Sequence, residues 1–408
     1  MLGKLLVKDD ETLRRLLSVF SALDEIRWNN PANYNLINYC FEDLTPDEKL
    51  LTHWLCYITD RQTAFERIWE VGGYVLSYLV RTYTRGISTP EEAFFEHYDV
   101  QNGYLHAPLV SPNKRLNSFG ILKEPVQFAS RYMPVDAISI FRTLYMLDQL
   151  SQRSFARFLR MIIREEVDHH SAIHKMAPAL HFLTYAGLGQ VKSTDVEYRI
   201  KEIIPRCTPQ ISQLKSDPKA FIAKLACDFY PFGKKRLWCS IRDYLKSPEF
   251  NNSLVQAFSD IDQGEAIRWN RDNSNLKLAL DTIELPGDVW NNNKTFKDGL
   301  FTPYLNPMPK SWDMPRTVRE IYKEQKEKLG GFYPEQLDVT FDFIPRMCDR
   351  RECHICLFGS GIKRLCGRQT GLYCPVFLSS CGYIHVCSPN ECKLKDDTVA
   401  GLCHSKFE

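Results

Sequence analysis

The sequence predicts a mainly helical protein that ends in a cysteine-rich, metal-binding module. Apolar residues recur at helical spacing through most of the first 330 residues, and period-two strand patterns are scarce there. Nine of the 14 cysteines, in contrast, fall between Cys348 and Cys403. We therefore expect a helical region over residues 1–330 and a separate module over residues 331–408.

Composition excludes several classes of protein. The 52 Lys and Arg residues nearly balance the 50 Asp and Glu residues, and the net charge of +2 excludes a histone-like polycation. With 44% apolar and 12% aromatic residues, the 408-residue chain can bury a large core. No stretch approaches the roughly 18 uninterrupted apolar residues of a membrane-spanning helix. We expect a soluble, cytoplasmic or nucleoid-associated protein without a membrane partner.

Two Thr-Pro motifs mark the starts of helices. Thr45-Pro46-Asp47-Glu48 combines an N-cap, Pro at the first helical position and a Glu that can close a capping box. A helix should run from there to about Arg61, and Thr89-Pro90-Glu91-Glu92 repeats the signal. Amphipathic segments predict further helices over residues 63–79, 135–150, 154–167, 172–186, 218–228 and 234–246.

A lysine-containing turn precedes the last of these helices. In Tyr230-Pro231-Phe232-Gly233-Lys234-Lys235, a Pro/Gly turn opens a helix. Free backbone N–H groups at a helix start, beside two adjacent lysines, form a natural phosphate-binding site. Gly233, Lys234 and Lys235 are therefore candidate contacts to a nucleic-acid backbone. The alternative is a solvated helix face, which paired lysines usually form.

A single carboxylate, Asp288, follows the apolar Pro-Gly turn of residues 283–287. Partial burial at such a turn can hold a carboxylate and shift its pKa. Trp290 and Asn291 come next and can line a base pocket, since aromatic stacking and amide hydrogen bonds recognise bases. The alternative is structural, because an Asp after Pro-Gly is commonly a turn or N-cap residue and loop aromatics commonly anchor the loop.

The cysteine cluster predicts a metal site. Cys353 and Cys356 form a C-x2-C pair, Cys348 precedes it, and Cys366 is the nearest fourth ligand. Reduced thiolates are soft ligands that bind zinc or an iron–sulfur cluster, so we expect zinc or [4Fe–4S]. The five later cysteines can form a second site or replace Cys366.

Basic residues surround these cysteines. Arg350 and Arg351 belong to a segment, residues 346–368, whose local charge excess is +4. This excess suits binding to a DNA backbone beside the metal. Alternatively, the arginines stabilise the thiolates electrostatically.

A second candidate site lies at residues 164–170. Glu166 and His169 have the i, i+3 spacing of a di-iron helix. That architecture needs a second such motif, which the sequence lacks. We therefore interpret this segment as a charged helix surface.

These motifs, in their order along the chain, resemble the helix-hairpin-helix DNA glycosylase superfamily, which includes the endonuclease III-like and archaeal 8-oxoguanine glycosylases. The helix ending in Gln62-Thr63 is similar to the family's leucine-rich helix, and residues 231–235 resemble its hairpin. Residues 285–289 are similar to the segment that carries its catalytic Asp, and the cysteine cluster occupies the place of its iron–sulfur module. The resemblance covers about a third of the chain.

The resemblance implies a helix-hairpin-helix bundle, with an insertion at about residues 101–209, that excises a flipped, modified or damaged base from double-stranded DNA. It implies that Gln62 fills the gap left by the base, that Asp288 is the catalytic carboxylate and that Lys235 forms the Schiff base of a bifunctional enzyme. If Lys235 only contacts phosphate, Asp288 activates water and the enzyme is monofunctional. Repair and defence against foreign DNA are both compatible settings.

We expect no small-molecule redox cofactor, and a monomer. The alternative function is that of a non-catalytic, metal-containing nucleic-acid-binding or adaptor protein.

Overall fold

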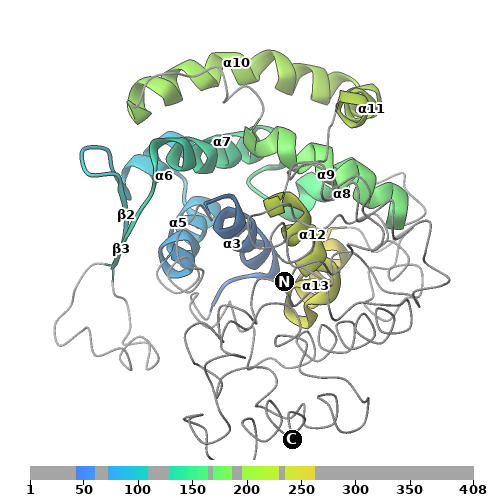
Figure 1. Cartoon of the computed structure of the whole chain (residues 1–408), viewed down its shortest axis with the longest axis horizontal. Coiled ribbons are helices and arrows are strands. Elements are labelled where there is room, and N and C mark those ends of the chain that lie inside the picture. Colours follow the sequence, from blue (N-terminus) through green and yellow to red (C-terminus); the bar gives the residue numbers. More distant parts are fainter. Residues whose placement is uncertain are drawn as a thin grey trace, which may run out of the picture. The chain divides into compact units, whose positions relative to one another are not determined.

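The computed structural model describes residues 43–59, 72–108, 128–163, 169–185, 195–228 and 235–261. These ranges contain ten helices and three short strands, which confirms the predicted mainly helical class (Figure 1). Apart from Lys235, they belong to one compact unit over residues 35–231 and 236–282. None of the helices in these ranges is long and apolar enough to cross a membrane.

Helix α3 (Pro46–Thr59) lies at the centre of this unit. Every residue from Leu50 to Thr59 is buried, as is typical of a helix that is covered on all sides. It contacts α5 (Gly73–Arg85) and α13 (Pro248–Ser259).

Three helices form a layer over α3 (Figure 1). They are α7 (Pro134–Ser151), α8 (Phe155–Ile163) and α9 (His169–Tyr185). All three contact one another, and α7 and α8 also contact α3. The indole Nε1 of Trp54 donates to Thr184 Oγ1 at 3.0 Å, which ties α3 to α9 through a buried hydrogen bond.

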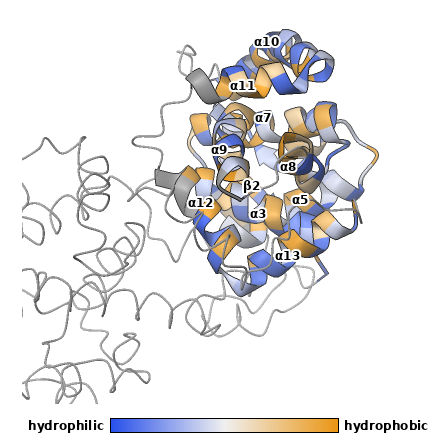
Figure 2. Cartoon of the chain, turned by 90° about the vertical axis from the view of Figure 1, so that its right-hand side faces the viewer, coloured by the Kyte–Doolittle hydropathy of each residue, from blue (hydrophilic) through white to orange (hydrophobic). Residues whose placement is uncertain are grey.

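Two further helices cover this layer. Helix α10 (Val196–Ser216) packs on α7, and α11 (Pro218–Asp228) packs on α9. Figure 2 shows hydrophilic residues along α10, as expected for an outer helix. The bounds of α11 agree with the predicted helix at 218–228, whereas α10 was not predicted.

A small antiparallel sheet follows the short helix α6 (Pro90–Phe95). Its strands are β1 (Tyr98–Asp99), β2 (Tyr104–Ala107) and β3 (Phe128–Arg131), in that order across the sheet. The register pairs Tyr98 with Leu105 and Tyr104 with Arg131. Gly103 closes the β1–β2 turn at a φ of 72°, a conformation that L side chains rarely adopt.

Helix α12 (Lys235–Lys246) begins one residue after the predicted start at 234 and ends where the sequence predicted. Ser247 separates it from α13, which has Pro248 at its first position, a favourable place for proline. The prediction missed α13. Both α12 and α13 contact α3, so that residues separated by 190 positions in the sequence meet in the core.

Candidate functional site at helices α3 and α12

Most of the predicted site residues lie outside the described ranges. Lys235 is the exception, because it is the first residue of α12, although only its backbone is described. The predicted residues outside these ranges are Gln62, Gly233, Lys234, Asp288, Trp290, Asn291, Arg350, Arg351, Cys348, Cys353, Cys356 and Cys366. In the second candidate segment, residues 164–168 are likewise outside, and His169 begins α9.

A buried polar network joins α12 to α3. The Asp243 carboxylate of α12 lies 3.2 Å from His53 Nε2 of α3, measured to Oδ2. The Tyr57 hydroxyl donates to the same oxygen. Arg242 Nε donates to the other oxygen, Oδ1, at 3.3 Å. His53 and Asp243 are each 1% exposed, so water does not compete for these contacts.

The charges in this network follow from burial and from close partners. Burial opposes the charged form of Asp243, but Arg242 and the hydrogen bonds from His53 and Tyr57 outweigh it and hold the pKa of Asp243 below its usual value. Burial lowers the pKa of His53, and Asp243 only partly opposes this shift. We therefore assign a charged Asp243 and a neutral His53 near pH 7.

Hydrogen-bond partners assign the tautomer of His53. Because the Asp243 carboxylate only accepts, Nε2 carries the proton and Nδ1 is the acceptor. Ser240 Oγ lies 3.5 Å from Nδ1. This order of groups is that of a catalytic Ser-His-Asp triad, but Ser240 is fully buried, at 0% exposure. Its side chain has no exposed surface for a substrate to reach, so the arrangement does not support hydrolysis by Ser240.

Aromatic rings surround His53. The ring centroids of Phe250 and Tyr244 lie 3.9 Å and 4.9 Å from that of His53. The Tyr244 hydroxyl donates to the backbone oxygen of Leu50 at 3.0 Å, which adds a second contact between α12 and α3. The network is therefore enclosed by apolar surface, where each hydrogen bond is strong and its loss is costly.

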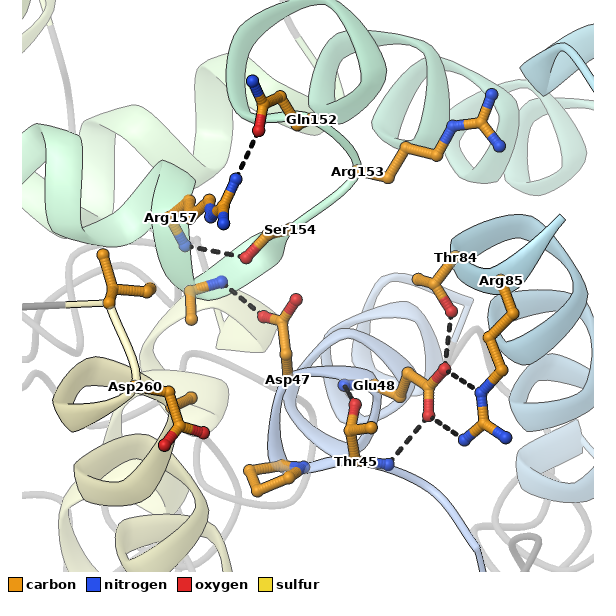
Figure 3. Close-up of a pocket in the computed structure, with 14 residues that line it drawn as sticks. Thr45, Asp47, Glu48, Thr84, Arg85, Gln152, Arg153, Ser154, Arg157 and Asp260 are labelled. Carbon is orange, nitrogen blue, oxygen red and sulfur yellow. Dashed lines mark hydrogen bonds and ion pairs between the residues drawn. The ribbon is translucent and has the colours of Figure 1, made fainter. Parts of the chain in front are cut away.

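A pocket of about 440 Å³ lies at the other end of α3 (Figure 3). The first turns of α3 and α8 line it, together with the C-terminal ends of α5 and α13 and the connection of residues 152–154 between α7 and α8. Asp47 Oδ1 accepts from the Ala156 backbone N–H at 2.5 Å and so caps α8. Burial raises the pKa of Asp47, although hydrogen bonds from Ala156 and Ser154 oppose the shift.

The arginines of this pocket are engaged by protein acceptors. Arg153 donates to Asp148 and to the backbone oxygens of Tyr83, Gly86 and Ser88, at 2.8–3.0 Å. Arg157 donates to Gln152. The pocket therefore lies at a polar junction where these arginine side chains connect helix ends.

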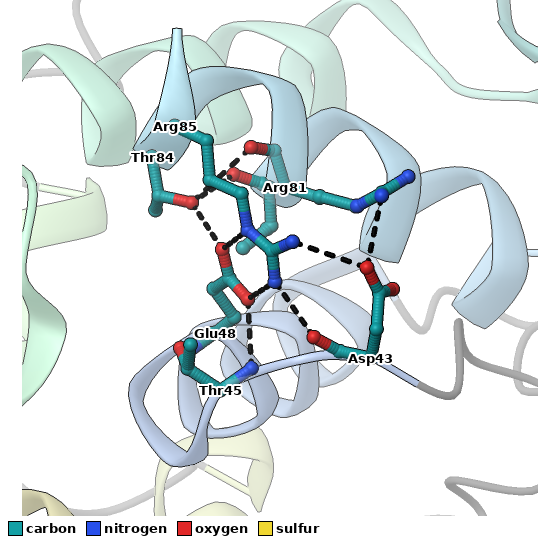
Figure 4. Close-up of polar contacts among 7 residues, drawn as sticks. Asp43, Thr45, Glu48, Arg81, Thr84 and Arg85 are labelled. Carbon is teal, nitrogen blue, oxygen red and sulfur yellow. Dashed lines mark hydrogen bonds and ion pairs between the residues drawn. The ribbon is translucent and has the colours of Figure 1, made fainter.

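An ion-pair network borders the same pocket (Figure 4). Arg85 binds Glu48 through two hydrogen bonds, Nε to Oε1 at 2.8 Å and Nη2 to Oε2 at 2.7 Å. Arg85 and Arg81 also pair with Asp43. Burial opposes the charge of Glu48, but the bonds from Arg85, Thr84 and Thr45 outweigh it and lower the pKa of Glu48.

Metal ligands do not cluster in the part of the chain that the structure describes. It contains no group of three or more His, Cys, Asp or Glu side chains that can hold a metal ion. Cys56 and Cys207 are buried there as free thiols. The predicted metal site at Cys348–Cys366 lies outside this part and stays a prediction.

Sequence reasoning missed His53, Tyr57 and Asp243. A signal was present: His53 and Tyr57 are four positions apart within the apolar helix of residues 46–59, so they share one face. Asp243 stands between Ile241 and the Tyr244-Leu245 pair of a second amphipathic helix. Polar residues at such positions need buried partners, although the sequence does not say which ones.

Comparison with known proteins gives no family assignment. No family model matches the chain, and no characterised protein and no solved structure shows significant similarity to it. The helix-hairpin-helix resemblance therefore rests on the motifs alone.

Proposed function

We propose that the protein is a DNA glycosylase that cleaves the N-glycosidic bond of a flipped, modified or damaged base and leaves an abasic site. One observation carries the proposal. Helix α12, which begins at Lys235, contacts α3, which ends at Thr59 three residues before Gln62. Helices α3 and α12 are thus next in the sequence to two of the motif segments, and the contact between these helices supports the proposal.

The chemistry requires a base outside the duplex. The enzyme extrudes the nucleotide at a cost of a few kcal/mol of unstacking, and Gln62 fills the space that the base leaves. Breaking the C1′–N bond builds positive charge on the sugar, which the Asp288 carboxylate stabilises. A water deprotonated by Asp288 then bonds to C1′, and the departing base takes up a proton.

Lys235 adds a second activity in the bifunctional form of the proposal. Its neutral amine attacks C1′ in place of water, and the base leaves and takes up a proton. A proton then moves from the attached nitrogen to O4′ as the C1′–O4′ bond opens, which gives a protonated imine. The adjacent Lys234 lowers the pKa of the attacking amine. In the monofunctional form Lys235 contacts only phosphate.

DNA contacts are divided among three segments. The start of α12, with Gly233 and Lys234 before it, binds a phosphate through backbone N–H groups and positive charge. Trp290 and Asn291 stack on the flipped base and hydrogen-bond to it. Arg350 and Arg351 bind the backbone beside the metal module, in which Cys348, Cys353, Cys356 and Cys366 hold zinc or [4Fe–4S].

The Asp288→Asn variant tests the catalytic assignment. We expect it to lose base excision, measured as alkali-labile breaks over a panel of duplexes that each carry one modified base. It should keep the wild-type affinity for a duplex that contains tetrahydrofuran, an abasic-site analogue. Asp260→Asn is the matched control, because Asp260 borders the pocket of Figure 3 and has no part in the proposed chemistry.

Two results would overturn the proposal. Equal excision by Asp288→Asn and wild type would remove the carboxylate from the mechanism. Tight binding to the tetrahydrofuran duplex, with no excision from any duplex of the panel, would identify a non-catalytic nucleic-acid-binding protein.

A further inference from the structure

The Asp243 network is placed where it can set the orientation of α12. We propose that Asp243, His53 and Tyr57 act as positioning residues that hold α12, and with it Lys235, in one rotation on α3. The inference rests on the proposed function for the role of Lys235, whereas the contacts themselves stand on the structure.

The geometry makes the contact specific to one rotation of the helix. His53 and Tyr57 lie one helical turn apart on α3, and both bond to the same carboxylate oxygen of Asp243. A one-residue rotation of α12 turns its side chains by about 100°, which would withdraw that oxygen from both donors. The donors are buried at 1% and 6% exposure, so their hydrogen bonds would not be replaced by water.

Helix α12 carries this restraint to its first residue. Lys235 precedes Asp243 by eight positions in one uninterrupted helix, roughly 12 Å along its axis at about 1.5 Å per residue. Attack on C1′ requires close alignment, and a displacement of about 1 Å can reduce the rate about 100-fold. A rotational restraint on α12 therefore acts on the rate of that step more than on DNA affinity.

The composition of the network fits a positioning role better than a stabilising one. Buried charged groups often contribute little net stability compared with apolar residues of similar size, and in some proteins they instead define one arrangement of the elements that they join. Here Asp243 joins α12 to α3 by hydrogen bonds, whose strength depends on the orientation of donor and acceptor. The aromatic side chains around them make contacts that depend much less on orientation.

The test compares Tyr57→Phe with Tyr83→Phe. Each variant removes one buried hydroxyl, but Tyr83 donates to the Leu144 backbone oxygen at 2.7 Å, between α5 and α7. Two measurements are made below the unfolding temperature of both variants. The first is amide hydrogen exchange of residues 235–246. The second is borohydride trapping on a duplex with a natural abasic site, where the lysine amine forms an imine with loss of water and hydride reduces it at C1′.

We expect Tyr57→Phe to speed exchange in α12 and to slow trapping about tenfold or more, since the lost bond goes to a charged acceptor. Its affinity for the tetrahydrofuran duplex should stay within about twofold of wild type, because the phosphate contacts are intact. Tyr83→Phe should change neither the α12 exchange nor the trapping rate.

Failure of the positioning role and failure of the proposed function give different results. The positioning role is overturned if wild type traps the abasic duplex and the two variants, Tyr57→Phe and Tyr83→Phe, show the same α12 exchange rates and the same trapping rate. If wild type does not trap, Lys235 is not the nucleophile and its positioning is overturned with the lyase step. Whether or not wild type traps the duplex, amide exchange rates of α12 that are the same in Tyr57→Phe and wild type overturn the proposed restraint on the rotation of α12.

Discussion

His53 shows how a single buried side chain makes the stability of the protein depend on pH. Burial holds the pKa of His53 below its ordinary value of 6.5, so the folded protein binds fewer protons there than the unfolded chain. Stability from this residue is fully present above about pH 6.5 and is lost progressively as the pH falls from there towards the lower pKa of the folded state. Asp243, whose pKa is also lowered, loses its contribution only in more acidic solution, below its ordinary value of 3.8.

We predict that His53→Gln flattens the dependence of stability on pH. Wild type should lose more stability than the variant between about pH 7.5 and pH 5.5, because only wild type carries the His53 imidazole, whereas His97, whose pKa burial also lowers, is present in both. Urea unfolding followed by circular dichroism at several pH values measures this. Tyr83→Phe should keep the wild-type slope, since Tyr83 does not titrate in this range. Parallel curves for His53→Gln and wild type would contradict the prediction.

At the scale of the helix, two capping boxes with the same Thr-Pro-x-Glu pattern have different surroundings. In the first, Thr45 and Glu48 bond reciprocally, and Glu48 also binds Arg85 and Thr84. In the second, Thr89 and Glu92 bond in the same way at the protein surface. The difference between Glu48 and Glu92 therefore isolates what burial and the Arg85 pair add to a capping box.

We predict that Glu48→Gln lowers the free energy of unfolding by about 1–3 kcal/mol, since it removes the charge that Arg85 and Thr84 bind. Arg85 keeps Asp43 as a partner and is 39% exposed, so the loss stays below that of a fully buried pair. Glu92→Gln should cost less, because water can replace its contacts. Urea unfolding at pH 7 measures both, and equal losses would show that Arg85 adds nothing.

Sequence patterns predicted most of the helices. Both Thr-Pro starts were predicted and are present, as are α7, α8, α9, α11 and α12 within a few residues. Helix α10 was missed because Pro205 and Pro209 look like helix breakers. Both prolines are exposed and four positions apart, so they lie on the outer face of α10, where water can satisfy the carbonyls that they leave unpaired. The strands were missed because two to four residues are too few to show a period of two.

Sequence patterns did not predict which distant segments contact each other. His53 and Asp243 are 190 positions apart, and nothing local in either helix names the other as its partner. Hydrophobic periodicity predicts that a face is buried but not against which element, so the sequence does not predict the pairing of α3 with α12. The chemistry predicted for Asp288 depends on the same kind of long-range contact.

At the scale of the whole molecule, the helical unit and the cysteine cluster should be separable by mutation. We predict that purified wild type contains a thiolate-bound metal and that Cys353→Ser loses it, because serine replaces one of the soft ligands. Elemental analysis counts the metal. Visible absorbance then identifies an iron–sulfur cluster, since zinc with its filled d shell gives none.

Cys207→Ala is the control: Cys207 is buried in α10, so its loss should reduce stability through a cavity and leave the metal in place. Full metal content in Cys353→Ser, or none in wild type, would contradict the assignment of this thiolate.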